Sequence, residues 1–482
     1  MSVRVRFAPS PTGMPHVGIM RTAIFDYLLA RHYGGQFIVR IEDTDRSRLV
    51  EGAVENIINA LRWLDMDWDE GPETGGDYGP YFQSERLELY HKHAKQLIEK
   101  GSAYWCNCTP ERLEQLRAEQ QAQKLDPKYD NRCRELGLDG EPGDGKHVLR
   151  FKIPAGGETA FHDELRGDIT VGNGELDDFV LLKRDGFPTY HFASCIDDHL
   201  MAISHVFRGE EWISSAPKHR LLYNAMGVEP PRFVHVPVIL GPDKTKLSKR
   251  HGAANILEYK EMGYLPEAML NFLALIGWNP GTDDEIMPRE KLIEAFTVER
   301  INTSPGVFDI EKLDWMNGEY IRRMSVEQLA ERLRPLMSDW GWLDADYQQE
   351  YVVEVVRLMQ ERLKKLAEMR EKADFFFEEP TEYDPKGVKK SFKGDDIIER
   401  LTAARDALGE CDWTLEGIEN AIRSTAERLD VGAGKIIHPL RLAVSGLTAG
   451  PGLFEMLHLL GREKVIGRVE KAIEWLKSNG RV

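Results

Sequence analysis

The first forty-five residues follow an order of strand, loop, helix and strand that restricts the chain to few folds. Apolar residues alternate with arginines from 3 to 7, the period-two pattern of a strand. The loop APSPTG that follows contains two prolines and a glycine, which end the strand. Apolar residues then recur at helical spacing from 17 to 28, Gly34-Gly35 ends the helix, and residues 36–41 form a second strand. We therefore expect a βαβ unit that binds its ligand at the strand C-termini and the helix N-terminus.

The rest of the chain divides into an interrupted α/β half and a helical half. At roughly 150 residues per domain, 482 residues correspond to about three units. Residues 101–190 carry short strand-like pieces, a polar helix at 111–124 and a hairpin whose arms, 180–182 and 187–191, meet at Asp185-Gly186. Beyond about residue 310 the apolar spacing is helical, with one helix start near Ser325. The predicted fold is an α/β Rossmann-like nucleotide-binding catalytic domain with an inserted α+β subdomain, followed by an all-α C-terminal half.

Composition restricts the environment and the partners. The chain carries 63 basic and 80 acidic residues, a net charge of −17, which argues against nucleic acid binding over its whole surface but allows a local basic patch. No window approaches the roughly 18 apolar residues of a membrane helix, and the first residues lack the apolar core of a secretory signal. Five cysteines are too few for a disulfide framework. We expect a cytoplasmic protein with no membrane partner.

A histidine and a glycine stand where the first strand passes into the first helix. The order Pro15-His16-Val17-Gly18 places His16 beside free backbone N–H groups and the positive end of the helix dipole, which attract anions. Gly18 has no side chain, so a flat ring could approach the backbone closely. The alternative is a surface histidine before a helix cap, and this pair by itself favours that alternative.

A basic segment follows the apolar, strand-like residues 233–240. Residues 243–252 read DKTKLSKRHG, with four cationic side chains from 244 to 250 and no acid after Asp243. Such a loop can neutralise the charge that builds on a polyphosphate when its α-phosphate is attacked. The alternative is a solvated basic turn. The position after a buried strand, where an α/β sheet binds ligands, favours the phosphate function.

In this order, the two segments closely resemble the paired signatures of class I aminoacyl-tRNA synthetases, and more narrowly those of bacterial-type glutamyl-tRNA synthetases. Further matching segments are RIEDTD at 40–45, FPTY at 187–190, IDDH at 196–199, RGEEW at 208–212, HPLR at 438–441 and GPGLF at 450–454. The resemblance runs from about residue 3 to about residue 476. It implies ATP-dependent ligation of L-glutamate to the 3′ end of tRNA-Glu through a glutamyl-adenylate, releasing AMP and pyrophosphate.

The resemblance also implies the residues of the site. The catalytic residues would be His16, Lys246 and Lys249. The ATP-binding residues would be His16, Gly18, Glu211, Ile239, Lys246, Lys249 and Arg250. The glutamate-binding residues would be Arg6, Ala8, Ser10, Glu42, Tyr190 and Arg208. Arginine suits a carboxylate because its guanidinium donates two parallel hydrogen bonds, and Glu42 suits the substrate ammonium. For Arg6 the alternative is an outward strand position, and for Glu42 a cap or salt bridge.

The same resemblance implies a division into domains. A split catalytic domain would comprise 1–85 and 191–243, and residues 86–190 would form an inserted subdomain that binds the acceptor end of the tRNA. Residues 244–325 would contact the tRNA stem and carry the KLSKR loop. Residues 326–375 and 376–482 would form helical domains that read the anticodon, because unpaired bases are the usual target of RNA recognition.

Three cysteines suggest a metal site in the inserted subdomain. Cys106, Cys108 and Cys133 are spaced like a zinc knuckle, and structural zinc takes four ligands, often thiolates or imidazoles. Some relatives supply a histidine two residues after the third cysteine, where this chain has Glu135. The sequence therefore leaves two alternatives, a Zn²⁺ site and three free cysteines that remain from a lost site.

Other functions of the same fold remain as alternatives. One is an enzyme that glutamylates a modified tRNA base, but such relatives are shorter and lack the helical half. Another is a catalytically silent paralogue that only binds RNA, which the intact His16, Lys246 and Lys249 oppose. A third is a glutamine-specific synthetase, which would end in β-barrels, and the helical spacing beyond about residue 310 opposes it. ATP chemistry implies Mg²⁺, the family suggests a monomer, and charging of tRNA-Gln in addition to tRNA-Glu is open.

Overall fold

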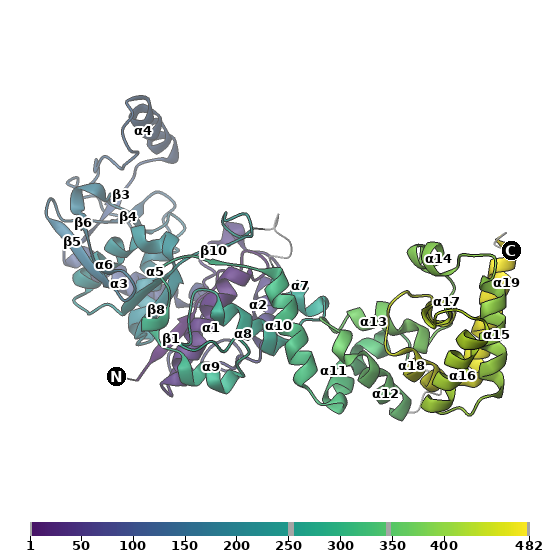
Figure 1. The fold of residues 1–482 in the computed structure, drawn as a ribbon. Coiled ribbons are helices and arrows are strands. Elements are labelled where there is room, and N and C mark those ends of the chain that lie inside the picture. The colour runs from purple at the N-terminus through teal and green to yellow at the C-terminus, as the bar shows by residue number, and fades with distance from the viewer. Residues whose placement is uncertain (1, 249–254, 344–348, 480–482) are drawn as a thin grey trace. The chain divides into compact units, whose positions relative to one another are not determined.

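The computed structural model describes residues 2–248, 255–343 and 349–479, which form two compact units. The first unit comprises Met1–Lys260 and Pro266–Ile310, and the second comprises Glu261–Leu265 and Glu311–Val482. Strands lie in the first unit and, among the described residues beyond Val307, only helices and turns occur. This confirms the predicted α/β part followed by an all-α part (Figure 1).

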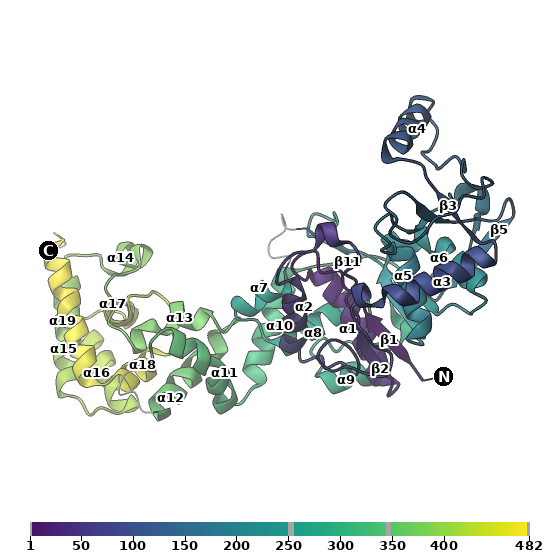
Figure 2. The same cartoon turned by 180° about the vertical axis from the view of Figure 1, so that it is seen from behind.

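The predicted βαβ unit is present at the start of the chain. Strand β1 (Arg4–Phe7) pairs in parallel with β2 (Gln36–Val39), and α1 (Val17–His32) connects them. Figure 2 shows the two strands side by side. Helix α1 is buried on most of its circumference because β1 lies on one side and helices α8 (Pro266–Leu275) and α9 (Arg289–Ala295) pack on another (Figure 1).

Both faces of β1 are covered, which the period-two pattern did not predict. Arg4 is 7% exposed and Arg6 is 4% exposed, alongside the buried Val5 and Phe7. The alternative of an outward strand position for Arg6 is therefore wrong. Parallel strands covered on both faces usually read as apolar runs, so a buried arginine in one indicates a specific partner.

A second pair of parallel strands lies beside β1. Strand β8 (His205–Gly209) pairs with β9 (Arg232–Val236), and the backbone N–H of Ser204 donates to Arg4 O at 2.8 Å, which joins β8 to β1. Helices α5 (Tyr190–Leu200) and α6 (Ala216–Met226) precede these two strands, and α2 (Ala53–Trp63) follows β2. The short strands β10 (Ile239–Leu240) and β11 (Gly306–Val307) pair in parallel.

Residues 86–190 contribute to two sheets. An antiparallel sheet has the order β3 (Ala103–Cys106), β4 (Val148–Phe151), β7 (Val180–Leu182), with α3 (Leu87–Glu99) and α4 (Pro110–Ala122) nearby in sequence. The hairpin β5 (Glu158–Asp163) and β6 (Gly167–Gly172) joins β9 in the order β6-β5-β9-β8. The inserted segment thus extends the sheet that carries β8.

The predicted hairpin at Asp185-Gly186 is only partly correct. The turn forms, since Gly186 N donates to Lys183 O at 3.0 Å and Lys183 N donates to Phe187 O at 2.8 Å. The expected second strand at 187–191 is wrong, because pairing ends at a single bridge to Pro188 and helix α5 begins at Tyr190. Short apolar runs fit strand and helix equally well, and here Pro188 ends the ladder.

The second unit is built from helices whose apolar stripes face one another. Its elements are α10 (Ile310–Arg323), α11 (Val326–Asp339), α12 (Gln349–Met359), α13 (Glu368–Ala373), α14 (Pro385–Ser391), α15 (Ile397–Glu410), α16 (Leu415–Arg428), α17 (Gly434–Ser445), α18 (Leu453–Leu460) and α19 (Arg462–Ser478). The short α7 (Ile256–Glu261) lies in the first unit except for Glu261. The predicted start near Ser325 is confirmed: Ser325 Oγ accepts from Gln328 N, and Ser325 N donates to Gln328 Oε1, a capping box.

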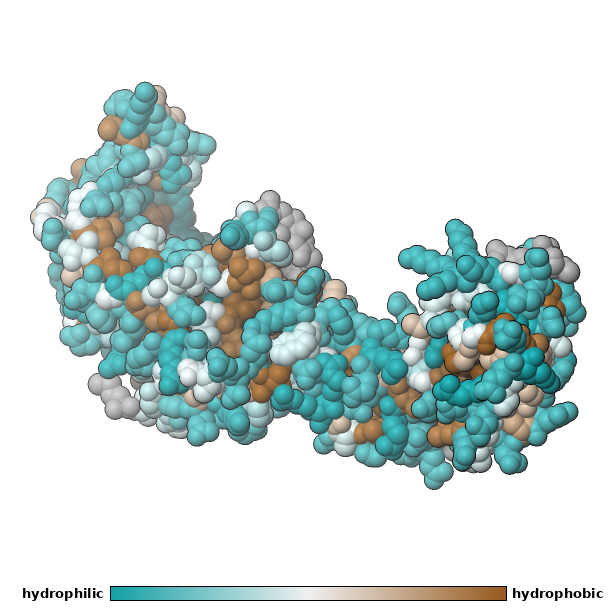
Figure 3. All heavy atoms as spheres, in the orientation of Figure 1, coloured by the Kyte–Doolittle hydropathy of each residue, from teal (hydrophilic) through white to brown (hydrophobic). Residues whose placement is uncertain are grey.

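The surface agrees with the charged composition. On the face drawn in Figure 3, hydrophilic residues cover most of the molecule, and an apolar patch interrupts them between the positions of β10 and α2. Within the described part of the chain, the helices are too short or too polar to span a bilayer.

Candidate functional site

A cavity of about 660 Å³ opens in the first unit, where β1 and β8 end and α1 begins. This is the position where open α/β sheets bind ligands. The predicted residues that the structure describes all line it: Arg6, Ala8, Ser10, His16, Gly18, Glu42, Tyr190, Arg208, Glu211, Ile239 and Lys246. Lys249 and Arg250 lie outside the described residues.

His16 is both a helix cap and a wall of the cavity. Its Nδ1 atom accepts a hydrogen bond from Gly18 N at 3.0 Å, and the residue occupies the N-cap of α1. Burial and the charge of Lys246 lower the pKa of His16, which keeps the imidazole neutral. Because Nδ1 accepts, the ring proton resides on Nε2, which is left to donate to a ligand. The cap that was an alternative in the sequence is thus present, and the same residue lines the cavity.

The basic segment contributes an accessible lysine at the cavity. Lys246 Nζ lies 3.6 Å from Glu211 Oε1, and both side chains are about half exposed or more. The neighbouring Leu247 is buried and also lines the cavity, which anchors the loop while the ammonium stays in water. A solvated ammonium beside a helix N-terminus suits a phosphate chain.

Arg6 and Glu42 belong to one buried ion network. Arg6 Nε donates to Asp198 Oδ1 at 3.0 Å, and Arg40 donates to Asp198 Oδ1 at 2.8 Å and to Glu42 Oε1 at 3.0 Å. Burial lowers the pKa of Arg6, but the charges of Asp198, Asp26 and Tyr190 together outweigh burial, and the pKa is raised. Burial raises the pKa of Glu42, and Arg40 and Arg6 only partly offset it. Glu42 thus forms the salt bridge that was its alternative and still faces the cavity.

Arg208 is held by side chains behind the cavity. Its Nε donates to His235 Nε2 at 2.9 Å and its Nη1 donates to His219 Nδ1 at 3.2 Å, while the buried Nη2 has no hydrogen-bond partner among the described residues. The ring of Tyr190 packs against Trp212 with centroids 4.4 Å apart. A buried guanidinium N–H without a partner beside a cavity is poised for an anionic ligand.

Sequence reasoning missed several residues of this cavity. Asp26, on α1, is 1% exposed, and neither of its carboxylate oxygens has a hydrogen-bond partner within the described ranges. Burial raises the pKa of Asp26 well above its ordinary value, against the charge of Arg6. Arg21 donates to Pro237 O at 2.5 Å, and burial lowers its pKa to about 10. Trp212, in the matching segment RGEEW, also lines the cavity. The available signal was that Arg21 and Asp26 stand among the apolar residues of α1.

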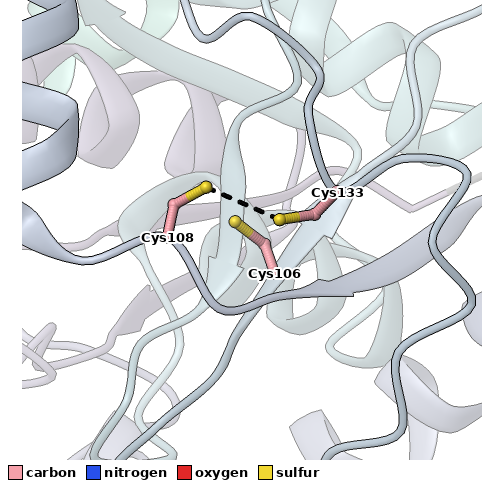
Figure 4. A group of neighbouring side chains, drawn as sticks. All are labelled: Cys106, Cys108 and Cys133. Atoms are coloured by element: carbon pink, nitrogen blue, oxygen red, sulfur yellow. Dashed lines mark hydrogen bonds between the residues drawn. The ribbon is translucent and has the colours of Figure 1, made fainter.

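The three cysteines converge in the first unit. The Sγ atoms of Cys106, Cys108 and Cys133 lie within 4.8 Å of one another, and the close-up shows all three pointing to a common centre (Figure 4). Tyr129 Oη lies 3.4 Å from Cys106 Sγ and 3.8 Å from Cys108 Sγ. Glu135 does not join them: its side chain is 80% exposed and pairs with Lys152 at 3.1 Å.

The cavity therefore offers complementary charges at two ends. Lys246 and the N-terminus of α1 with His16 suit a polyphosphate. Arg6 and Arg208 suit carboxylates, and Glu42 suits an ammonium group. An amino acid with an acidic side chain and a nucleoside triphosphate together fit this set of charges.

Comparisons with known proteins agree with this chemistry. A family model for the catalytic domain of class I tRNA synthetases (E and Q) matches residues 2–315, and a model for an anticodon binding domain matches residues 328–473. The glutamate–tRNA ligase of Dehalococcoides mccartyi is 50% identical over 475 residues, which cover 98% of this chain and 97% of that protein. That of Moorella thermoacetica is 45% identical over 491 residues, covering 99% of each chain.

A solved structure resembles the whole chain. The crystal structure of a glutamate tRNA ligase from Elizabethkingia meningosepticum, in complex with its amino acid, has a TM-score of 0.88 and 38% sequence identity, and the match covers 98% of this chain and 99% of that one. Fold, site chemistry and these relatives agree, and the chain belongs to the glutamate–tRNA ligase family of class I tRNA synthetases.

Proposed function

We propose that the chain ligates L-glutamate to the 3′ end of tRNA-Glu. A carboxylate oxygen of glutamate attacks the α-phosphorus of ATP, the bond to the β-phosphate oxygen breaks, and pyrophosphate leaves. A hydroxyl of the terminal adenosine then attacks the acyl carbon of the glutamyl-adenylate, and AMP leaves. The observation that carries this proposal is one cavity that combines Arg6, Arg208 and Glu42 with His16 and Lys246.

ATP binds, in this proposal, at the start of α1. His16 Nε2 donates to the phosphates, and Gly18 lets the purine approach the backbone because it has no side chain. A Cβ at position 18 would also press on His16 Nδ1, at 3.3 Å. Lys246, Lys249 and Arg250 neutralise the phosphates, and Lys249 acts on the transition state. Glu211 and the backbone near Ile239 contact the ribose and adenine.

Glutamate binds deeper in the same cavity. Arg6 and Arg208 bind its carboxylates, Glu42 binds its ammonium group, and Ala8, Ser10 and Tyr190 complete the walls. The raised pKa of Glu42 is consistent with this function, because an arriving ammonium group favours the ionised form.

Mg²⁺ enters with ATP as its phosphate complex in our proposal. Among the described residues, the one group of three or more His, Cys, Asp or Glu side chains with ligand atoms within 4.8 Å of one another is the cysteine cluster. The side chains proposed for the phosphates are His16 and the lysines of the basic segment. Mg²⁺ commonly binds through substrate phosphates and water with few protein ligands.

Both units contribute to tRNA binding in this proposal. We propose that residues 326–375 and 376–482 bind the anticodon arm, that 86–190 bind the acceptor end, and that 244–325 contact the stem. The match of an anticodon binding model to residues 328–473 supports the first assignment. The split catalytic domain at 1–85 and 191–243 and a monomeric state complete this proposal.

The cysteine cluster is the proposed site of Zn²⁺. Three thiolates within 4.8 Å of one another supply three of the four ligands of structural zinc, in which Zn–S bonds of about 2.3 Å place sulfurs roughly 3.8 Å apart. Zinc bound there would crosslink β3 to the loop that carries Cys133. Metal analysis of the purified protein should find about one zinc per chain, and Cys133→Ser should lose it. A metal-free native protein would leave three free thiols as the correct alternative.

Aminoacylation of purified tRNA-Glu and tRNA-Gln with glutamate tests the central proposal. We expect tRNA-Glu to be charged, and charging of tRNA-Gln to tell a non-discriminating from a discriminating ligase. Lys249→Ala should lower the rate by roughly two to three orders of magnitude, the effect of removing one transition-state cation. ATP–pyrophosphate exchange should require tRNA-Glu. Absence of both exchange and charging would favour an RNA-binding protein.

A further inference from the structure

Arg208 lies in the middle of a buried chain of hydrogen-bonded side chains. On one side, Arg208 Nε lies 2.9 Å from His235 Nε2, and His235 Nδ1 lies 2.6 Å from Asp163 Oδ2. On the other side, Arg208 Nη1 lies 3.2 Å from His219 Nδ1, and His219 Nε2 lies 3.0 Å from His191 Nδ1. Asp163 and His235 are fully buried, and His219 is 3% exposed. The members come from β5, β9, β8, α6 and α5.

The guanidinium sets the direction of every hydrogen bond in this chain. Arginine only donates, so His235 Nε2 and His219 Nδ1 must both accept. His235 therefore carries its proton on Nδ1 and donates to Asp163, whereas His219 carries its proton on Nε2 and donates to His191. One arginine thus determines the tautomers of three histidines, and each of them is neutral.

The surroundings keep the histidines in that state. Burial lowers the pKa of His219 well below its ordinary value, and the charge of Arg208 acts in the same direction. Burial also lowers the pKa of His235, against the hydrogen bond to Asp163. Asp163 stays ionised because four backbone and side-chain donors reach its oxygens, from His235 N, His235 Nδ1, Leu165 N and Arg166 N.

We propose that Asp163, His235, His219 and His191 are positioning residues that hold Arg208 with its Nη2 directed at the substrate carboxylate. The unpartnered Nη2, buried beside the cavity, is the atom left for that purpose among the described contacts. This inference rests on the proposed function of Arg208 in binding glutamate. A guanidinium with two of its three nitrogens fixed loses little freedom when the substrate arrives, which favours binding of a single carboxylate geometry.

Leucine and asparagine at position 219 provide a matched pair of variants. They have nearly the same shape, but only asparagine places an acceptor, Oδ1, where His219 has Nδ1. His219→Leu should raise the KM for glutamate by roughly tenfold or more, the usual cost of losing a hydrogen bond to a charged group. His219→Asn should restore most of the affinity, and the KM values for ATP and tRNA-Glu should stay unchanged in both. His162→Leu, an exposed histidine on β5, is the control and should behave as native.

His191, the half-buried last member of this hydrogen-bonded series, supplies a second pair of variants in case His219→Leu does not fold. His191→Leu and His191→Asn differ in the same way at the acceptor for His219 Nε2, and the leucine variant should have the higher KM for glutamate. Circular dichroism and thermal unfolding establish folding of each variant. Equal glutamate KM values within each pair, in proteins that charge tRNA-Glu normally, would overturn the positioning function alone. A native chain that charges no tRNA-Glu would instead refute the function of Arg208 on which it rests.

Discussion

His16 Nδ1 accepts a hydrogen bond from the backbone N–H of Gly18 at 3.0 Å, so one imidazole both caps α1 and turns Nε2 towards the cavity. The two functions can be separated by mutation. Asparagine is among the best N-cap residues and can keep the cap, but it has no atom at the position of Nε2.

His16→Asn should therefore fold with native stability and charge tRNA-Glu roughly 10²- to 10³-fold more slowly, the effect of losing one transition-state donor. His16→Ala should lose the same activity and, in addition, about 1 kcal/mol of unfolding free energy with the cap. Steady-state charging and urea unfolding measure the two effects. Native activity in His16→Asn would remove Nε2 from the mechanism.

Lys246 should matter for the rate and not for the stability. Its side chain is 67% exposed, so Lys246→Met should change the melting temperature little while slowing adenylate formation by roughly 10²-fold or more. Lys244→Met is the matched control, because Lys244 lies on the same loop, is exposed, and is absent from the described lining of the cavity. Equal rates for the two variants would contradict the function of Lys246.

Arg40 should be essential for stability. It is fully buried and donates to Asp198 and Glu42, with Asp197 at 3.9 Å, so Arg40→Met leaves carboxylates buried without their partner. Breaking such a network typically costs about 3–5 kcal/mol. Urea unfolding measures the loss. Arg62→Met, which removes an exposed pair with Glu73, should cost less than about 1 kcal/mol, and a similar loss in both variants would show that burial of the pair is irrelevant.

Asp26 should make stability depend on pH. Its folded pKa is raised well above the unfolded value, mainly by burial, so the stability it contributes is present below the unfolded pKa and is lost as pH rises through the folded pKa. Asp26→Asn cannot ionise and should become progressively more stable than the native chain as pH rises above about 4. Unfolding free energies of the native protein and of Asp26→Asn, measured between about pH 4 and about pH 8, test this prediction.

Asp45→Asn supplies the contrast. Hydrogen bonds from Ser47 and Arg48 lower the pKa of the exposed Asp45, so its contribution is present above the unfolded pKa and is lost as pH falls. The two aspartates should therefore show opposite pH trends in different windows: Asp26 as pH rises above about 4, and Asp45 as pH falls below about 4, so the Asp45 series extends down to about pH 2. A pH-independent difference between native and Asp26→Asn proteins would mean that Asp26 is ionised at all these pH values.

Local sequence patterns correctly predicted the elements that are defined by residues close together in the sequence. The helix at 17–28 was found because apolar residues recur on it, and the helix start at Ser325 because its capping residues are local. The strand at 187–191 was wrong because a run of five residues carries no periodicity that separates strand from helix. The alternation at 3–7 predicted a strand but not that Arg4 and Arg6 would be buried, since both faces are covered by elements distant in sequence.

The sequence by itself determined the family and the members of the cavity that belong to its ordered motifs, because those motifs are contiguous and each has a chemical purpose. Only the tertiary structure decided what holds them. Asp198, which binds Arg6, is 192 residues away, and His235 and Asp163, which orient Arg208, lie on two other strands. Such contacts arise when strands and helices pack, and no local periodicity encodes which buried polar groups will meet.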